Sequence, residues 1–249
     1  MADNQRLETE LALAALKSSA ADWEVFLSSK SATPMVFAGA DLSDIDLAGR
    51  NLSGNDFTGA DFFEGKLSSA NLKHAKLAGA DLSGADLSSA GLYKASLTSA
   101  TMTAANLEGA DLTEADLSHA DLRGTSLVGA NLTGADLRGA DLTNADLRDA
   151  CLARANITSA SFRTARIDGA NVTGIVYGSY KDMGGLYLGI RGLDSVYGNA
   201  LFVRDSKDQY YIVTLESSIS VLPEGFTKTI EVLLFKAWGL FDHGRSLLK

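Results

Sequence analysis

The sequence predicts an all-β solenoid built from five-residue repeats, and two observations carry this prediction. From Phe37 to Val172 every fifth residue is apolar, which gives 28 consecutive core positions, 20 of them Leu. Ala stands two residues before the core position in 22 of these 28 repeats. Only 46% of the chain is hydrophobic, so an unbroken run of this length is not a product of composition.

The spacing inside each repeat favours a short strand over a helix. Residues two apart, such as Ala40 and Leu42, point to the same side of an extended chain. In an α-helix a step of five turns the chain by about 140°, which would scatter the core positions around the axis. The three-residue step to the next Ala must reverse the pleat, so a bend follows each strand, often with Gly as at Gly79 and Gly134.

The repeats resemble the A(D/N)LXX motif of the pentapeptide-repeat family over residues 35–174. Two examples are the strings Ala110-Asp111-Leu112-Thr113-Glu114 and Ala130-Asn131-Leu132-Thr133-Gly134. The resemblance implies a right-handed quadrilateral β-helix in which four repeats close a square coil of about 20 residues, and therefore about seven coils. With rungs about 4.8 Å apart, the rod would be roughly 34 Å long.

Residues 1–34 are predicted to form an N-terminal helical cap. A solenoid needs a cover over its end coils, and residues 5–30 carry apolar side chains at helical spacing, including Leu7, Leu11, Leu16 and Trp23. The stretch 16–26 also resembles the short Trp-containing helix that precedes the repeats in many bacterial members of the family. We expect one helix that covers the first coil.

Residues 175–249 are predicted to form a small α+β region. Residues 201–204 and 210–215 have strand composition and are joined across 205–208; a helix is the alternative for the second segment. From about Phe226 to Trp238 the apolar positions recur at helical spacing. Residues 238–246 resemble a segment that leads into membrane helices in longer family members, but the chain stops first, so we expect no stable membrane insertion. A cap or a homo-oligomer contact is the expected role.

Composition excludes several classes of function. The formal net charge of −9 argues against direct nucleic-acid binding. The single cysteine excludes internal disulfides, and no Cys/His spacing resembles a zinc site. No stretch has the length of a membrane span or the pattern of a leader, which indicates a cytoplasmic protein.

No residue pattern indicates catalysis, so we expect a protein that is not an enzyme and holds no metal or cofactor. His74 and His119 lie at outward bend positions, His243 lies in the tail, and none has a partner in the sequence. Cys151 precedes a core position and is expected to be an inert surface thiol. The tail charges have ordinary loop spacing: Asp194, Asp205, Asp208 and Arg245.

Acidity on the exterior is the one functional signal. With coils of 20 residues, one face would carry seven acids against the two bases Arg123 and Arg163, and the acids are Asp41, Asp44, Asp61, Glu64, Asp81, Asp121 and Asp141. They are the candidate partner-binding residues. The competing interpretation is geometric, because the position before the core residue holds Asp in 12 repeats and Asn in 6. That interchange is typical of a side-chain hydrogen bond to a bending backbone.

The sequence therefore favours a non-catalytic scaffold that binds a protein partner, or forms part of an assembly, through its flat faces and C-terminal region. The alternative comes from the resemblance, since some family members mimic duplex DNA and inhibit DNA gyrase or protect it from quinolones. A membrane-linked signalling module is the third possibility.

Overall fold

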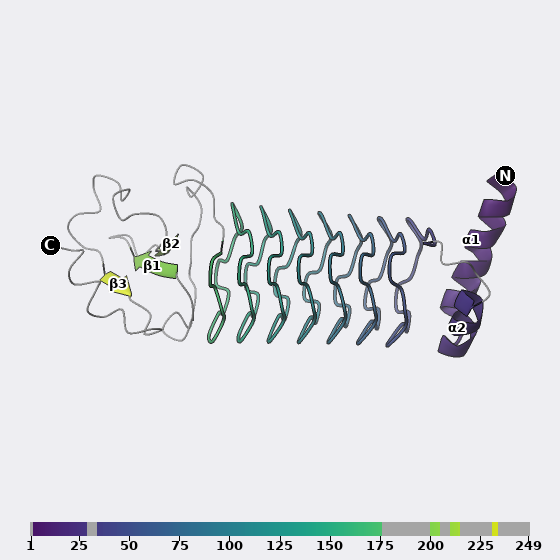
Figure 1. The fold of residues 1–249 in the computed structure, drawn as a ribbon, viewed down its shortest axis with the longest axis horizontal. Coiled ribbons are helices and arrows are strands. Elements are labelled where there is room, and N and C mark those ends of the chain that lie inside the picture. Colours follow the sequence, from purple (N-terminus) through teal and green to yellow (C-terminus); the bar gives the residue numbers. More distant parts are fainter. Residues whose placement is uncertain (1, 29–33, 176–199, 205–209, 215–230, 234–249) are drawn as a thin grey trace.

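The computed structural model describes residues 2–28, 34–175, 200–204, 210–214 and 231–233. Two helices come first, α1 (Ala2–Lys17) and α2 (Ala20–Ser28). A long rod of stacked coils follows from residue 34 to residue 175, as Figure 1 shows. Three short strands lie near the C-terminus: β1 (Ala200–Arg204), β2 (Tyr210–Thr214) and β3 (Glu231–Leu233).

The rod is held together by parallel backbone pairing between residues that are 20 apart. The residue before each core position pairs with its equivalent one coil later, beginning with Val36 and Asp56 and ending with Cys151 and Asn171. The Leu42 N–H donates to the Asp61 carbonyl at 2.7 Å, and the Asp61 N–H donates to the Ala40 carbonyl at 2.9 Å. Because these bonds join successive coils, each coil is stabilised by its neighbours alone, as in other solenoids.

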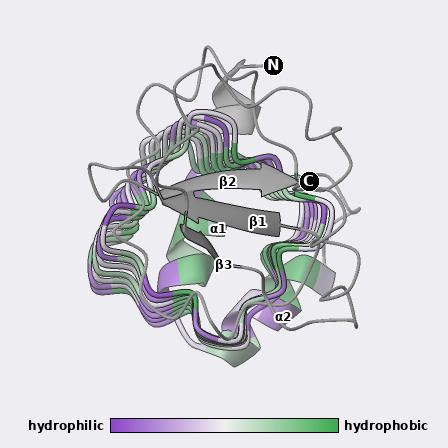
Figure 2. Cartoon of the chain, turned by 90° about the vertical axis from the view of Figure 1, so that its left-hand side faces the viewer, coloured by the Kyte–Doolittle hydropathy of each residue, from purple (hydrophilic) through white to green (hydrophobic). Residues whose placement is uncertain are grey.

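A tight turn follows every core residue. The Ala80 N–H donates to the Leu77 carbonyl, three residues earlier, at 3.1 Å. Gly79, between them, has a φ of 65°. The second residue after the core position has positive φ in all repeats, from Gly39 to Gly174. A turn with positive φ only at this place is typical of type II. Four such turns per 20 residues give the four-sided outline in Figure 2, which looks along the rod.

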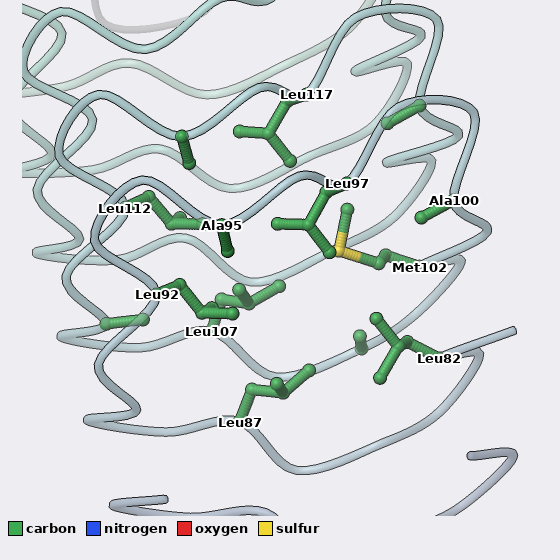
Figure 3. Packing of buried hydrophobic residues seen from close by; sticks show 14 of the residues in the cluster. Leu82, Leu87, Leu92, Ala95, Leu97, Ala100, Met102, Leu107, Leu112 and Leu117 are labelled. Atoms are coloured by element: carbon green, nitrogen blue, oxygen red, sulfur yellow. The ribbon is translucent and has the colours of Figure 1, made fainter. Parts of the chain in front are cut away.

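The interior of the rod is filled by the predicted core residues. All 28 core side chains are at most 5% exposed, and the Ala residues that precede them are buried too, apart from a half-buried Ala40. Figure 3 shows Leu92 beneath Leu112 and Leu82 beneath Met102, each side chain stacked on its equivalent in the next coil. The predicted alternation of small and large apolar side chains on the inner surface is therefore confirmed.

The N-terminal segment forms two helices, so the prediction of one helix over residues 5–30 is wrong at Ser18 and Ser19. The Ser19 hydroxyl and backbone N–H both bond the Asp22 carboxylate, at 2.7 and 3.3 Å, and the Asp22 N–H donates back to the Ser19 hydroxyl at 3.2 Å. This reciprocal pair is a capping box, which starts a new helix. The helical spacing of apolar residues continues across this break, so the spacing alone does not indicate it.

The helices pack against the first coil through one buried arginine and one buried tryptophan. Arg50 occupies a position where most repeats have Ala, and its two terminal nitrogens donate to the carbonyls of Leu16 and Ser18, both at 2.7 Å. These are orphan carbonyls at the C-terminal end of α1, which a cation satisfies well. Trp23 is fully buried, donates to the Asn51 carbonyl at 2.9 Å, and has its ring centroid 6.2 Å from that of Phe37.

The three C-terminal strands form an antiparallel sheet in the order β2-β1-β3. Ala200 pairs with Thr214 and Arg204 with Tyr210, which is the predicted hairpin, so a helix at the second segment is wrong. Phe202 pairs with Leu233, so β3 lies inside the segment predicted to be a helix from Phe226 to Trp238, and that prediction is wrong for Glu231–Leu233. The remainder of that segment and the predicted oligomer contact lie outside the described residues.

Candidate functional site

The side chain before each core residue stabilises the turn that follows. All 12 Asp and all 6 Asn side chains at this position accept a hydrogen bond from the backbone N–H two residues later, at 2.9–3.3 Å. Asp and Asn offer the same oxygen for this bond. The geometric interpretation of the Asp/Asn interchange is therefore confirmed, and the bond itself does not require a charge.

The bonds stabilise the charged form of several of these carboxyls. The Ser43 hydroxyl and N–H donate to Asp41 and hold its pKa below the usual range, with a smaller contribution from Lys17 of α1. The Thr58 hydroxyl has the same effect on the pKa of Asp56, aided by Lys76 from the next coil. Hydrogen bonds to a carboxylate favour its ionised form, so the rod keeps these charges at neutral pH.

The structure aligns the predicted acidic face. The backbone pairs Asp41 with Asp61, Asp61 with Asp81, and Asp121 with Asp141, while Thr101 fills the gap in the column. Asp44 and Glu64 lie at the turn position of the same face, with φ of 55° and 54°. Like charges one rung apart, about 4.8 Å, repel by roughly 1 kcal/mol even in water.

Arginine neutralises one half of this face. Arg123 follows a core residue, and its guanidinium forks onto Asp121, with Nε and Nη2 at 2.8 and 2.6 Å from the two carboxylate oxygens. Its Nε also lies 4.0 Å from Asp141. Arg138 and Arg148 occupy the same place in their own repeats and fork onto Asp136 and Asp146. An Arg two residues after the Asp is the sequence signal for this pairing, and our sequence reasoning did not use it.

The other half of the face is acidic and carries an exposed aromatic ring. The place after the core residue holds Ser43, Phe63 and Ser83 in the first three coils, where Arg123 stands later. Phe63 is 46% exposed, although it lies in the rigid rod. Our sequence reasoning missed this residue, and its signal is a bulky apolar side chain at a place that most repeats give to a small or polar one. We call Phe63 with its five acidic neighbours the Phe63 patch: Asp41, Asp44, Asp61, Glu64 and Asp81.

The other groups singled out in the sequence do not assemble into a site. His74 lies edge-on to Tyr93 with ring centroids 5.5 Å apart, and the Lys94 ammonium lies 5.2 Å from the centre of the same ring. The Cys151 sulfur is half-buried, 3.3 Å from the Thr133 hydroxyl. His243 and the tail charges Asp194, Asp205 and Asp208 lie outside the described residues, as does Arg245.

Within the described ranges, no group of three or more His, Cys, Asp or Glu side chains has a geometry that could hold a metal ion. Across the same ranges, no helix combines the length and apolar character needed to cross a membrane.

Comparison with known proteins finds a family match in the repeat region of the chain. A family model described as pentapeptide repeats matches residues 36–64 and, in overlapping segments, 66–175, which together exceed half of the chain. No curated protein matches the chain at a significant level.

Three solved structures illustrate the similarity. HetL, a pentapeptide repeat protein involved in heterocyst differentiation regulation in the cyanobacterium Nostoc sp. strain PCC 7120, is 36% identical over 57% of this chain and 72% of its own, with a TM-score of 0.32. Rfr23 from the cyanobacterium Cyanothece 51142 is 30% identical over 45% of this chain and 64% of its own, with a TM-score of 0.29. A trypsin-treated form of QnrB1, a plasmid-mediated fluoroquinolone resistance protein, is 22% identical over 61% of this chain and 76% of its own, with a TM-score of 0.48.

Proposed function

Because this chain belongs to the pentapeptide-repeat family, we propose that it is a non-catalytic scaffold that binds a protein partner through a flat face of its rod. Members of the family form right-handed quadrilateral β-helices. With four repeats per coil, the 28 repeats of this chain make seven such coils. The acidic face described above is the candidate surface for the partner.

One observation carries the proposal. The backbone N–H and C=O groups of the rod are paired between coils and its interior is filled by apolar side chains, so its outward side chains form rigid, regular ladders. Rigid surfaces lose little conformational entropy on binding, which favours recognition of a partner. A filled interior offers no cleft for a small substrate, and clefts are where ligands are normally held.

Site-specific crosslinking tests this function. A photoreactive amino acid is placed at one outward position on each face, at Ser83, Ser88, Thr113 and Thr98, in cells of the source organism. We expect a discrete adduct of defined mass from one face and none from the opposite face. Absence of an adduct from all four positions, with the protein folded and abundant, would contradict the scaffold.

DNA mimicry directed at gyrase stays the alternative, and the charge distribution argues against it. Duplex DNA carries about one negative charge per 1.7 Å along its length. Here the acidic column is paired with Arg123 over its second half. We therefore expect no inhibition of gyrase supercoiling by the purified protein. Inhibition that Asp81→Lys and Asp121→Lys both relieve would support mimicry instead.

A further inference from the structure

We propose that the Phe63 patch is the docking surface and that its occupant is a cationic segment of a partner protein with an apolar side chain between two basic ones. The inference rests on the proposed scaffold function and adds the place of binding and the chemistry of the partner.

Phe63 has the features of an interface anchor. Its ring is 46% exposed, and the coils on either side present only Ser43 and Ser83 at the equivalent place, so these equivalent side chains do not cover it. Its own N–H is fixed by Asp61 at 2.9 Å, which holds the residue in a rigid turn. A rigid aromatic side chain in the middle of a surface typically supplies much of the binding energy when a partner buries it.

The charges around Phe63 are not needed for the fold. Asn71 shows that Asn makes the same turn bond as Asp61. Gly84 occupies the turn position of Glu64 one coil later with a similar positive φ, which Gly adopts without steric cost. Asp44 and Glu64 nevertheless stand at turn positions that Gly would fill with less strain, and neither forms an ion pair within the described part of the chain. The geometry of the repeat accounts for an oxygen at Asp61 and Asp81 but not for five negative charges together.

The patch also lacks the neutralising arginine that the repeat accommodates elsewhere. An arginine at the place of Phe63 would fork onto Asp61, as Arg123 forks onto Asp121. Lys17 of α1 makes a small contribution to lowering the pKa of Asp41 at the edge of the patch. An apolar ring thus stands where charge pairing is available, and the carboxylates beside it remain to pair with an incoming cation.

The dimensions of the patch fit a short extended segment. Asp41, Asp61 and Asp81 lie on three successive rungs, which spans about 10 Å. Alternate residues of an extended peptide are about 6.7 Å apart. Alternate residues also point to the same side of the peptide, so basic residues two before and two after an apolar residue face the patch together with it, about 13 Å apart. Their flexible side chains reach both ends of the column while the apolar side chain lies on Phe63.

Binding of a defined peptide to the full chain tests the inference. The probe is a fluorescein-labelled nonapeptide of lysines with leucine at its centre, followed by anisotropy at about 50 mM salt, where charge screening is modest. Phe63→Ser copies the residue of both neighbouring coils and should weaken binding about tenfold. Asp61→Asn and Asp81→Asn keep the turn bond and should each weaken it about threefold. Asp111→Asn on the opposite face is the matched control and should leave binding unchanged.

Three outcomes would overturn the inference. The first is that an all-lysine peptide binds as tightly as the leucine-containing one, which would show attraction by net charge alone. The second is that Asp111→Asn weakens binding as much as Asp61→Asn or Asp81→Asn does. The third is that Phe63→Ser changes neither the affinity for the peptide nor the melting temperature. Self-association of the unmodified chain that Phe63→Ser abolishes would also overturn it, by identifying a second copy as the occupant. A crosslinked adduct from another face, unaffected by Phe63→Ser, would reject this patch and retain the scaffold.

Discussion

The residue that closes each turn sets the local strain of the rod. Thirteen repeats place Gly there and fifteen place another residue, with φ between 54° and 71°. The left-handed region costs a residue with a Cβ roughly 1–2 kcal/mol, and Asn, Asp and His tolerate it best. Asn144, Asp149 and His119 follow this preference, whereas Ala104 and Lys94 do not.

Exchanges at the turn position should therefore change stability in opposite directions. Ala104→Gly relieves strain at a φ of 57° and should raise the free energy of unfolding by about 0.5–1 kcal/mol. Gly79→Ala adds a Cβ that meets no atom within 4 Å, so only backbone strain acts, and it should lower that energy by about 1 kcal/mol. Urea denaturation measures both. Changes of the same sign would show that backbone strain at this position does not limit stability.

Carboxylates held by arginine should make the rod sensitive to acid. The forked Arg123 and Arg148 side chains hold the pKa values of Asp121 and Asp146 below their usual range in the folded state. A carboxyl with a lowered folded pKa contributes stability above its unfolded pKa of about 3.9, and that contribution is lost as the pH falls through the folded value. We expect the melting temperature to fall steeply below about pH 4.

The double variant Asp121→Asn/Asp146→Asn isolates this effect. Asn retains the bond to the backbone N–H that both Asp side chains accept, but it cannot titrate. The melting temperature of the double variant should be lower than that of the unmodified chain at pH 7, and the difference between the two melting temperatures should narrow toward pH 2. A gap that stays constant across this range would assign the acid sensitivity to other groups.

At the scale of an element, the N-terminal cap depends on one buried cation. The Arg50 guanidinium bonds the carbonyls of Leu16 and Ser18 at the end of α1, and its side chain is only 8% exposed. The aromatic series continues the contact into the rod, since Phe37 and Phe57 stack with ring centroids 5.1 Å apart. The cap is thus joined to the coils by directed bonds and by aromatic packing.

Removal of the cation should release the cap and leave the coils folded. Arg50→Met keeps much of the side-chain volume but leaves two carbonyls without their partner, which should cost about 2 kcal/mol. Limited proteolysis near Ser18 and Ser19 should become faster, while circular dichroism of the rod changes little. Lys66→Met, at an exposed position of the rod, is the control. Equal proteolysis of the two variants would contradict the role of Arg50.

Periodicity explains which elements the sequence could predict. The interior of the rod was predictable because each repeat states the same pattern, from Phe37 to Val172. The break between α1 and α2 was not seen, since apolar spacing is blind to the local bonds of Ser19 and Asp22. β3 falls in a stretch whose apolar residues fit helical spacing, and its pairing with Phe202 is a long-range contact that overrides local pattern.

The alignment of the acidic column and the presence of Arg123 and Arg163 on its face were predictable from the repeat, but the carboxylate that Arg123 pairs with was not. Stacking by 20 residues aligned Asp41, Asp61 and Asp81 as expected. Whether a carboxylate is neutralised depends on the side chain two residues later. Arg123 pairs with Asp121, whereas Phe63 offers no charge to Asp61. Surface function in a solenoid is thus decided by exceptions to the repeat, which a search for the repeat itself passes over.

At the scale of the whole molecule, pairing between neighbouring coils predicts that a complete coil can be removed. Deletion of residues 95–114 joins Lys94 to Ala115 and keeps both the five-residue phase and the 20-residue register, so the Ala75 carbonyl, which accepts from Ser96, would accept from Asp116 instead. The variant should unfold cooperatively at lower denaturant, because one interface between coils is lost. X-ray scattering should show a rod shorter by about 4.8 Å. If the variant shows no cooperative unfolding transition, it does not fold. That result would mean that contacts beyond neighbouring coils stabilise the rod, as in a globular core, where removal of 20 central residues prevents folding.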